Sequence, residues 1–207
     1  MDFLKRKDIP FITVGLVVIN VLVFLKLDVL GNSLDPGYLY EHGGMYLPDV
    51  LDNGEWYRVF THMFLHSGFE HLANNMVMLA AVGYIIENEY GRWKYLISYF
   101  VCGLCATVLS AVNEYYHQDF AVGVGASGAI MGVFGIYIVM TVKARKSQGY
   151  DSRQLMVLLV LMVFGNMQEG VNWVAHLGGA VSGVILGALL YWPPKKESYG
   201  TTYAPYE

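Results

Sequence analysis

The chain carries a serine and a histidine in glycine-rich surroundings, a combination that can perform nucleophilic catalysis. Ser127 stands in the sequence Gly-Ala-Ser-Gly, and His176 stands in Ala-His-Leu-Gly-Gly. A serine hydroxyl is a weak nucleophile unless a neighbouring base, such as an imidazole, accepts its proton. Taken singly, Ser127 would serve equally well as a helix cap, and His176 as a packed histidine bonded to a backbone carbonyl. Their joint placement on glycine-lined segments makes a nucleophile–base pair the more specific interpretation.

A second pair, His71 and Asn75, could stabilise negative charge. The two residues are four positions apart, so on a helix they share one face. An imidazole N–H and an amide group are both hydrogen-bond donors. Two donors facing a serine nucleophile suit the oxyanion that develops when a carbonyl group is attacked. Hydrogen bonding between neighbouring helices is the alternative explanation of this pair.

Metal binding is a rival interpretation of the histidines. His62 and His66 are also four apart, and together with His71 they could resemble a set of zinc ligands. The chain has no HExxH sequence, and no carboxylate joins the histidines at ligand spacing. Cys102 and Cys105 form a CxxC without a second pair, which favours packing over metal binding. We therefore expect no metal and no other cofactor.

The composition indicates a membrane protein. Charged residues make up 14% of the 207 residues, against roughly 25% in a typical soluble domain, and the mean hydropathy is +0.41. The apolar content excludes a disordered chain, and the presence of only two cysteines excludes a disulfide framework. The net charge of −4 gives no basic surface for nucleic acid.

Six segments without charged residues are candidates for membrane-spanning helices, which need about 20 apolar residues. They are Ile9–Leu25, His71–Ile86, Tyr95–Asn113, Phe120–Val142, Gln154–Gln168 and Gly170–Pro194. The second and the fifth are short and have to borrow flanking residues. No small-residue cleavage site follows the first, so we expect a retained helix rather than a signal peptide. We expect an all-α, polytopic bundle of six transmembrane helices over residues 9–192, with no further helix or soluble domain. We expect residues 1–8 to form a cytoplasmic N-terminus and residues 193–207 a disordered cytoplasmic tail.

The charges of the loops predict the orientation. With the N-terminus in the cytoplasm, all but two of the 13 Lys and Arg residues fall on the inner side, as the positive-inside rule requires. The two exceptions are Lys26 and Arg58. Both termini are therefore expected in the cytoplasm. The longest loop, Leu30–Phe60, falls outside and is rich in aromatic residues, so we expect it to rest on the membrane surface rather than to be a floppy connector.

The segment that carries Ser127 is unusually rich in glycine, with Gly123 and Gly125 before the serine. These glycines predict irregular backbone, which at membrane depth has to be enclosed by protein or to line a water-filled cavity. We expect a helix that begins at Ser127, with the serine as N-cap, and runs to Val142, which is too short to cross a bilayer alone. Its first turn should lie below the outer membrane surface, at the bottom of a cavity that opens outward.

The segment that carries His176 has its own stripe of small residues at Gly179, Gly183 and Gly187. Small residues at four-residue spacing let two transmembrane helices approach closely. His176 projects from the same stripe. A matching stripe follows Ser127, at Gly128, Gly132 and Gly135. If the two stripes pack together, Ser127 and His176 come to lie side by side.

Five short motifs follow one another between Gly54 and Leu190. They are Glu55-Trp56-Tyr57-Arg58 in the first loop, His66, His71 and Asn75 in the second helix, Glu87 and Gly91 as ExxxG, Gly125-Ala126-Ser127-Gly128 as GxSG, and Ala175-His176-Leu177-Gly178-Gly179 with Gly183 as AHxxGxxxG. They resemble the motifs of the rhomboid family of intramembrane serine proteases, in the same order and in the corresponding segments. GxSG alone is a weak signal, but the ordered set is specific.

The resemblance implies a Ser–His dyad without an acid, which cleaves transmembrane segments of membrane-protein substrates near the outer face. Ser127 would be the nucleophile and His176 the general base, while Asn75, His71 and the backbone N–H of Ser127 would form the oxyanion hole. Residues in supporting positions would be Gly125, Gly128, Met131, Gly179, Arg58 and Glu87. The expected surroundings are a lipid bilayer, in a bacterial plasma membrane, and the expected partners are the substrates, with no nucleic acid.

One residue departs from the pattern of the family. Four residues after the serine, where the family commonly has an aromatic ring stacked on the histidine, this chain has Met131. A thioether can also pack against an imidazole.

Two other functions fit less well. Inactive relatives that only bind membrane clients lose the serine or the histidine, whereas a transporter or channel needs ionisable residues along a path across the membrane.

Overall fold

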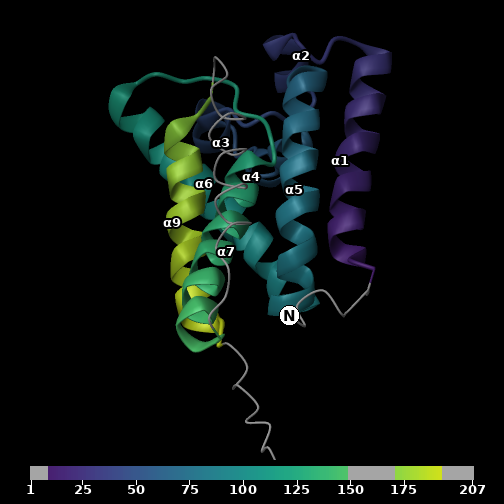
Figure 1. Ribbon diagram of the computed structural model, residues 1–207. Helices are drawn as coiled ribbons and strands as arrows, with labels where there is room; N and C mark the ends of the chain where they lie inside the picture. The colour runs from purple at the N-terminus through teal and green to yellow at the C-terminus, as the bar shows by residue number, and fades with distance from the viewer. Residues whose placement is uncertain (1–8, 149–170, 193–207) are drawn as a thin grey trace, which may run out of the picture.

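The computed structural model describes residues 9–148 and 171–192, which form an all-α bundle (Figure 1). Five helices are long and apolar enough to cross a membrane: α1 Phe11–Leu30, α5 Gly68–Tyr90, α6 Arg92–His117, the stretch Ser127–Ala144 of α7 (Ser127–Gln148), and α9 Trp173–Leu190. The predicted all-α, polytopic fold is thus confirmed for the described residues. The fifth predicted segment, Gln154–Gln168, lies outside them, as do both predicted tails, so the count of six helices stays a prediction.

Helix α5 shows why the helices are longer than the segments free of charge. It extends beyond His71–Ile86 at both ends and includes Glu87, which is only 2% exposed. The Glu87 carboxylate accepts hydrogen bonds from the backbone N–H groups of Ile12 (3.0 Å) and Thr13 (2.8 Å), and from the Thr13 hydroxyl (2.9 Å). The first N–H groups of a helix have no partner within it. Glu87 supplies that partner and joins the start of α1 to α5.

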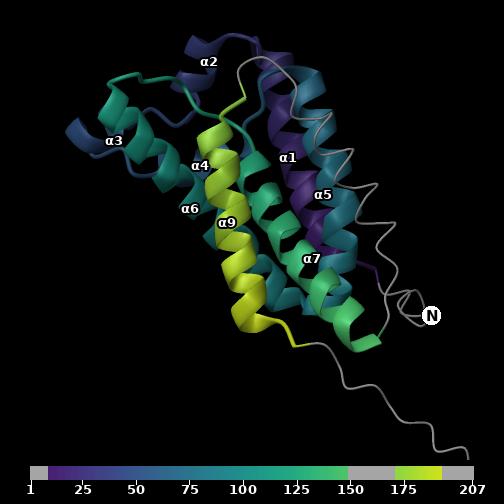
Figure 2. The same ribbon diagram turned by 60° about the vertical axis from the view of Figure 1, so that its left-hand side comes forward.

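Helix α7 lies at the centre of the bundle (Figures 1 and 2). Of its apolar span 67% is buried, against 28% in α1 and 28% in α9. A Cβ atom at Gly179 would collide with the carbonyl oxygen of Gly128, and one at Gly183 with the carbonyl oxygen of Gly132. The two predicted stripes of small residues therefore face each other, and the missing side chains let the two backbones touch.

The long first loop is folded around an arginine. It contains α2 Pro36–Glu41, α3 Leu47–Asp52, α4 Arg58–Thr61 and the 3-10 turn η1 His62–Phe64. The Arg58 side chain is buried, donates to the carbonyl oxygens of Tyr40 (2.6 Å) and Gly44 (2.8 Å), and pairs with Glu55 (2.5 Å). The loop is therefore not a floppy connector. Its predicted contact with the membrane surface stays a prediction.

The helix ends are distributed as the predicted topology requires. The start of α1 and the ends of α7 and α9 lie at one end of the bundle, and α2 lies at the other (Figures 1 and 2). At the first of these ends, the ammonium of Lys143 donates to the carbonyl oxygens of Ala188 (2.7 Å) and Tyr191 (2.7 Å). These bonds hold the C-terminal end of α9 against α7. Which end faces the cytoplasm stays a prediction.

Candidate active site

The loop that leads to Ser127 is fixed by backbone hydrogen bonds to the first loop. Met45 and Gly123 each donate an N–H to the other's carbonyl oxygen, at 2.8 Å in both directions. The N–H of Gly125 donates to the carbonyl oxygen of His62 (2.9 Å). Gly125 has φ +118°, which residues with a side chain rarely adopt. The irregular, glycine-rich backbone predicted before the serine is therefore present and held on both sides.

The helix begins at Ser127 as predicted, but the serine is not its cap. The predicted end at Val142 was wrong: the helix runs to Gln148, and its apolar stretch Ser127–Ala144 is long enough to cross a membrane. The N–H of Ile130 donates to the carbonyl oxygen of Ala126 (3.0 Å), which makes Ala126 the N-cap and Ser127 the first helical residue. The predicted N-cap role of Ser127 was wrong by one residue, because the backbone already turns into the helix at Gly125. The structure records no hydrogen bond between the Ser127 hydroxyl and any other described residue. The hydroxyl therefore does not cap the helix.

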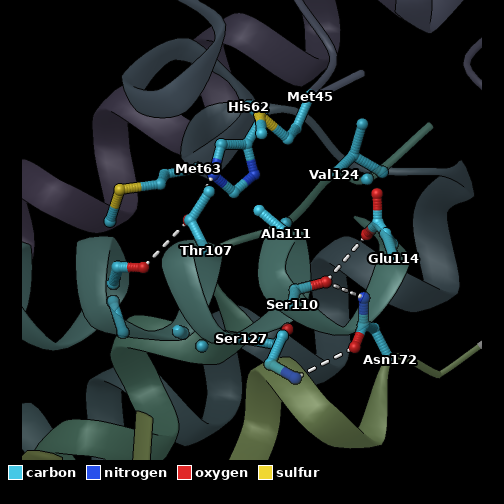
Figure 3. Close-up of a pocket in the computed structure, with 17 residues that line it drawn as sticks. Met45, His62, Met63, Thr107, Ser110, Ala111, Glu114, Val124, Ser127 and Asn172 are labelled. Carbon is cyan, nitrogen blue, oxygen red and sulfur yellow. Dashed lines mark hydrogen bonds between the residues drawn. The ribbon is translucent and has the colours of Figure 1, made fainter. Parts of the chain in front are cut away.

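Ser127 lies in a recess of the bundle. In both views α7 begins well below the upper ends of α1 and α5 (Figures 1 and 2). A cavity of about 60 Å³ is lined by Ser127 (Figure 3). The other polar side chains of its wall are His62, Thr107, Ser110, Glu114 and Asn172. Such a cavity has room for ordered water, which the hydrolysis of an ester or amide consumes.

His176 lies in the first turn of α9 and is 5% exposed. It precedes Gly179, which packs on Gly128 beside the serine, so the backbones that carry Ser127 and His176 meet at the same level. Among the described residues no hydrogen bond joins the two side chains, and Nδ1 of His176 is buried without a partner. Hydrogen bonds between catalytic groups are often long without substrate and tighten when it binds.

The ring that contacts His176 comes from an unpredicted position. The indole of Trp173 lies at 6.0 Å from the imidazole, measured between ring centroids, with an interplanar angle of 72°. Met131, at the position where the resemblance implies a ring, is half-buried. Trp173 is three residues before His176 on the same helix, a spacing that brings side chains together. A search for aromatic residues at helical spacing from the histidine would have found it.

His71 and Asn75 both face the loop that precedes the serine. A Cβ atom at Gly125 would lie 2.9 Å from Cε1 and Nε2 of His71 and 3.6 Å from Nδ2 of Asn75. Nδ2 of Asn75 is buried and has no hydrogen-bond partner among the described residues. The N–H of Ser67 donates to Nδ1 of His71 (3.4 Å), so the proton of the neutral imidazole resides on Nε2. Two N–H donors are thus directed at the backbone beside Ser127.

The other two histidines of the rival metal-binding interpretation, His62 and His66, serve the loop structure. Nε2 of His62 is 2.9 Å from the hydroxyl of Thr107, and the ring of His66 lies 5.1 Å from that of His71, edge to face. Burial lowers the pKa of His62 to about 4, and burial together with His71 lowers the pKa of His66 to about 3. Both are therefore neutral near pH 7. No three His, Cys, Asp or Glu side chains among residues 9–148 and 171–192 are grouped to hold a metal ion.

A chain of polar side chains that links α6 to α9 was not predicted from the sequence. Ser110 donates its hydroxyl proton to Glu114 (2.8 Å), and the amide of Asn172 donates to the Ser110 hydroxyl (2.6 Å) (Figure 3). Two signals were present. Ser110 and Glu114 are four residues apart on one helix, and Asn172 precedes an apolar run as a helix N-cap does.

Comparison with known proteins identifies relatives over most of the chain. The Rhomboid domain profile matches residues 53–193. The chain is 29% identical to rhomboid protease AarA of Providencia stuartii, over 89% of this chain and 74% of that protein. It is 28% identical to rhomboid protease GluP of Bacillus subtilis, over 92% of this chain and 37% of GluP. It is 30% identical to Rhomboid-type serine protease 2 of Emericella nidulans, over 80% of this chain and 33% of that protein. The chain thus spans about a third of the length of the last two relatives.

Proposed function

The chain belongs to the rhomboid family and is an integral membrane serine protease, and we propose that Ser127 and His176 form its catalytic dyad. One observation carries the proposal: Gly125 packs against Nε2 of His71 and lies beside Nδ2 of Asn75, two residues before the serine. A nucleophile next to two N–H donors, of which the Asn75 amide has no partner among the described residues, is what acyl transfer requires. The close packing of α7 on α9 at their glycines supports His176, in the first turn of α9, as the base.

The proposed reaction follows from these groups. Neutral His176 accepts the hydroxyl proton while Ser127 Oγ attacks the carbonyl carbon of the scissile peptide bond. The resulting oxyanion accepts hydrogen bonds from Nδ2 of Asn75, Nε2 of His71 and the backbone N–H of Ser127. That N–H is among the first of α7, where backbone donors have no partner within the helix. The imidazolium then protonates the leaving amine, which leaves an acyl ester on Ser127. A water molecule, deprotonated by His176, hydrolyses the ester and regenerates the serine.

The recessed position of Ser127 supports a membrane-protein substrate cut within or near its transmembrane segment. A continuous helix hides its peptide bonds behind intrahelical hydrogen bonds, so the substrate has to unwind at the cut. Glycine or proline near the scissile bond should therefore speed cleavage. The positive-inside rule supports an orientation with both termini in the cytoplasm and the serine towards the outer face. Bacterial relatives support a bacterial plasma membrane.

The test is active-site labelling of the purified protein in detergent. A fluorophosphonate should label the wild type, and neither Ser127→Ala nor His176→Ala should be labelled. Both variants should lose cleavage of a model transmembrane substrate while they keep the elution volume and melting temperature of the folded protein. Turnover by Ser127→Ala at the wild-type rate would overturn the proposed dyad.

A further inference from the structure

A chain of hydrogen bonds begins at a carboxylate on α6 and ends on the backbone of the turn that carries His176 (Figure 3). Glu114 accepts from the Ser110 hydroxyl (2.8 Å), and Ser110 accepts from Nδ2 of Asn172 (2.6 Å). Oδ1 of Asn172 accepts from the N–H of Ala175 (2.9 Å), and its backbone carbonyl accepts from the N–H of His176 (3.1 Å). Asn172 is therefore both the N-cap of α9 and the residue that ties this cap to α6.

We propose that Asn172 is a positioning residue for His176, held in place by Ser110 and Glu114; this inference rests on the dyad proposed above. In the described part of the chain no hydrogen bond orients the imidazole directly, and its buried Nδ1 has no partner there. Its position then follows from the position of its own helical turn. The Asn172 cap fixes that turn against α6, next to the cavity that Ser127 lines.

The chemistry of the three side chains sets the direction of every bond in the chain. A carboxylate only accepts hydrogen bonds, so the single hydroxyl proton of Ser110 points to Glu114. The Ser110 oxygen is then left to accept, and it faces the NH₂ group of Asn172. This arrangement directs Oδ1 of Asn172 to the N–H of Ala175, which is the orientation that a cap requires. Glu114 therefore determines, through Ser110, which way round the Asn172 amide lies.

Two variants break the link without altering the dyad. Ser110→Ala removes the bridging hydroxyl and leaves α9 unchanged. Asn172→Asp keeps a capping oxygen for Ala175 but replaces the NH₂ donor by an acceptor that faces Ser110. Ser182→Ala is the matched control, because its hydroxyl, also on α9, donates to the carbonyl oxygen of Gly179 (2.7 Å) and has no part in the chain of Glu114, Ser110 and Asn172. Kinetics on a model transmembrane substrate and melting temperatures are measured for all of them in the same detergent.

We expect Ser110→Ala and Asn172→Asp each to lower kcat about tenfold, the size of effect that follows from one lost hydrogen bond. KM should change by less than about twofold, since the substrate does not touch these groups. The double variant should be no slower than the slower single variant, because both changes cut the same link. Glu114→Gln, whose amide oxygen still accepts the Ser110 proton, should retain most of the kcat that Glu114→Ala loses. Ser182→Ala should resemble the wild type.

The inference is overturned if Ser110→Ala and Asn172→Asp keep the kcat of the wild type, if only KM changes, or if the two effects multiply in the double variant. Should Ser110→Ala fail to fold, the comparison of Glu114→Gln with Glu114→Ala decides, and equal kcat values for these two overturn it. Wild type and Ser127→Ala are run beside them. Failure of the proposed dyad shows as cleavage by Ser127→Ala, whereas failure of this inference shows only in the link variants and leaves Ser127→Ala inactive.

Discussion

The indole ring of Trp173 lies edge-on to the imidazole of His176, with ring centroids 6.0 Å apart and an interplanar angle of 72°. Edge-to-face ring pairs are favourable beyond the area that they bury. The resemblance to the rhomboid family implies such a ring on α7, at the position of Met131, but here the ring comes from the helix of the histidine itself. Trp173 is 60% exposed, so its contact with His176 is on one side only.

Replacement of Trp173 should therefore affect catalysis more than folding. We expect Trp173→Ala to lower kcat several-fold and Trp173→Phe to keep most of it, because a phenyl ring can make the same edge contact. Met131→Tyr should recover part of the loss in the Trp173→Ala background by supplying a ring from α7. Steady-state kinetics on one substrate measure all four proteins. Equal kcat values for Trp173→Ala and wild type would show that the contact does not hold the imidazole.

Loss of the Asn75 amide should slow the chemical step. Removal of one oxyanion donor usually lowers kcat about 10²–10³-fold with a smaller change in KM, and we expect this for Asn75→Ala. His71→Ala should be similar or milder, since the Asn75 amide and the Ser127 N–H remain. EDTA should have no effect on the wild type. A metal site would give the opposite pattern: inactivation by EDTA, recovery with zinc, and a loss in His62→Ala or His66→Ala as large as in His71→Ala.

A methyl group at position 125 should disturb the same donors. In Gly125→Ala the new Cβ would lie 2.9 Å from Nε2 of His71, too close for an unshifted ring. We expect kcat to fall at least tenfold. Gly54→Ala is the control, because Gly54 also has a positive φ (+71°) but nothing within 4 Å of its added Cβ. An equal loss of activity in both variants would assign the effect to backbone strain rather than to the His71 contact.

Acid should destabilise the fold through His62. Burial lowers its pKa to about 4, whereas in the unfolded chain a histidine titrates near about 6.5. As pH falls from about 6.5 to about 4, only the unfolded state takes up the proton, so the free energy of unfolding decreases, by on the order of 3 kcal/mol in total. The melting temperature in detergent should drop over this range in the wild type and drop less in His62→Gln. An identical drop in both proteins would contradict this assignment.

The membrane orientation can be tested with an impermeant thiol reagent in intact cells. The native cysteines, Cys102 and Cys105, are first replaced by alanine. Asp35→Cys, in the first loop, should react from outside, because the loop charges place this loop on the outer face. Ser147→Cys, near the cationic end of α7, should react only after the cells are opened. Labelling of Ser147→Cys in sealed cells would reverse the predicted topology.

Local patterns in the sequence were enough to predict much of the fold. Charge-free segments indicate membrane-spanning helices, and each of the five such helices described overlaps a predicted segment. The glycines of α7 and α9 recur at helical spacing, and their contact was predictable because only small residues let two helices touch. His71 and Asn75 could be assigned to one helix face from their spacing alone. These features depend on neighbours within a few residues, and the order of residues specifies them.

Contacts between distant residues were decided by the tertiary structure. The bond from Asn172 to Ser110 joins residues far apart in the sequence, and it depends on how α6 and α9 are rotated and how deep each one lies. Helical periodicity gives the face of one helix but neither its depth nor its rotation relative to the next. The shift of the cap from Ser127 to Ala126 has the same origin, since the bonds of Gly123 to Met45 and of Gly125 to His62 fix where the chain turns into α7. The sequence was enough to propose the residues of the candidate site, but their surroundings are set by packing.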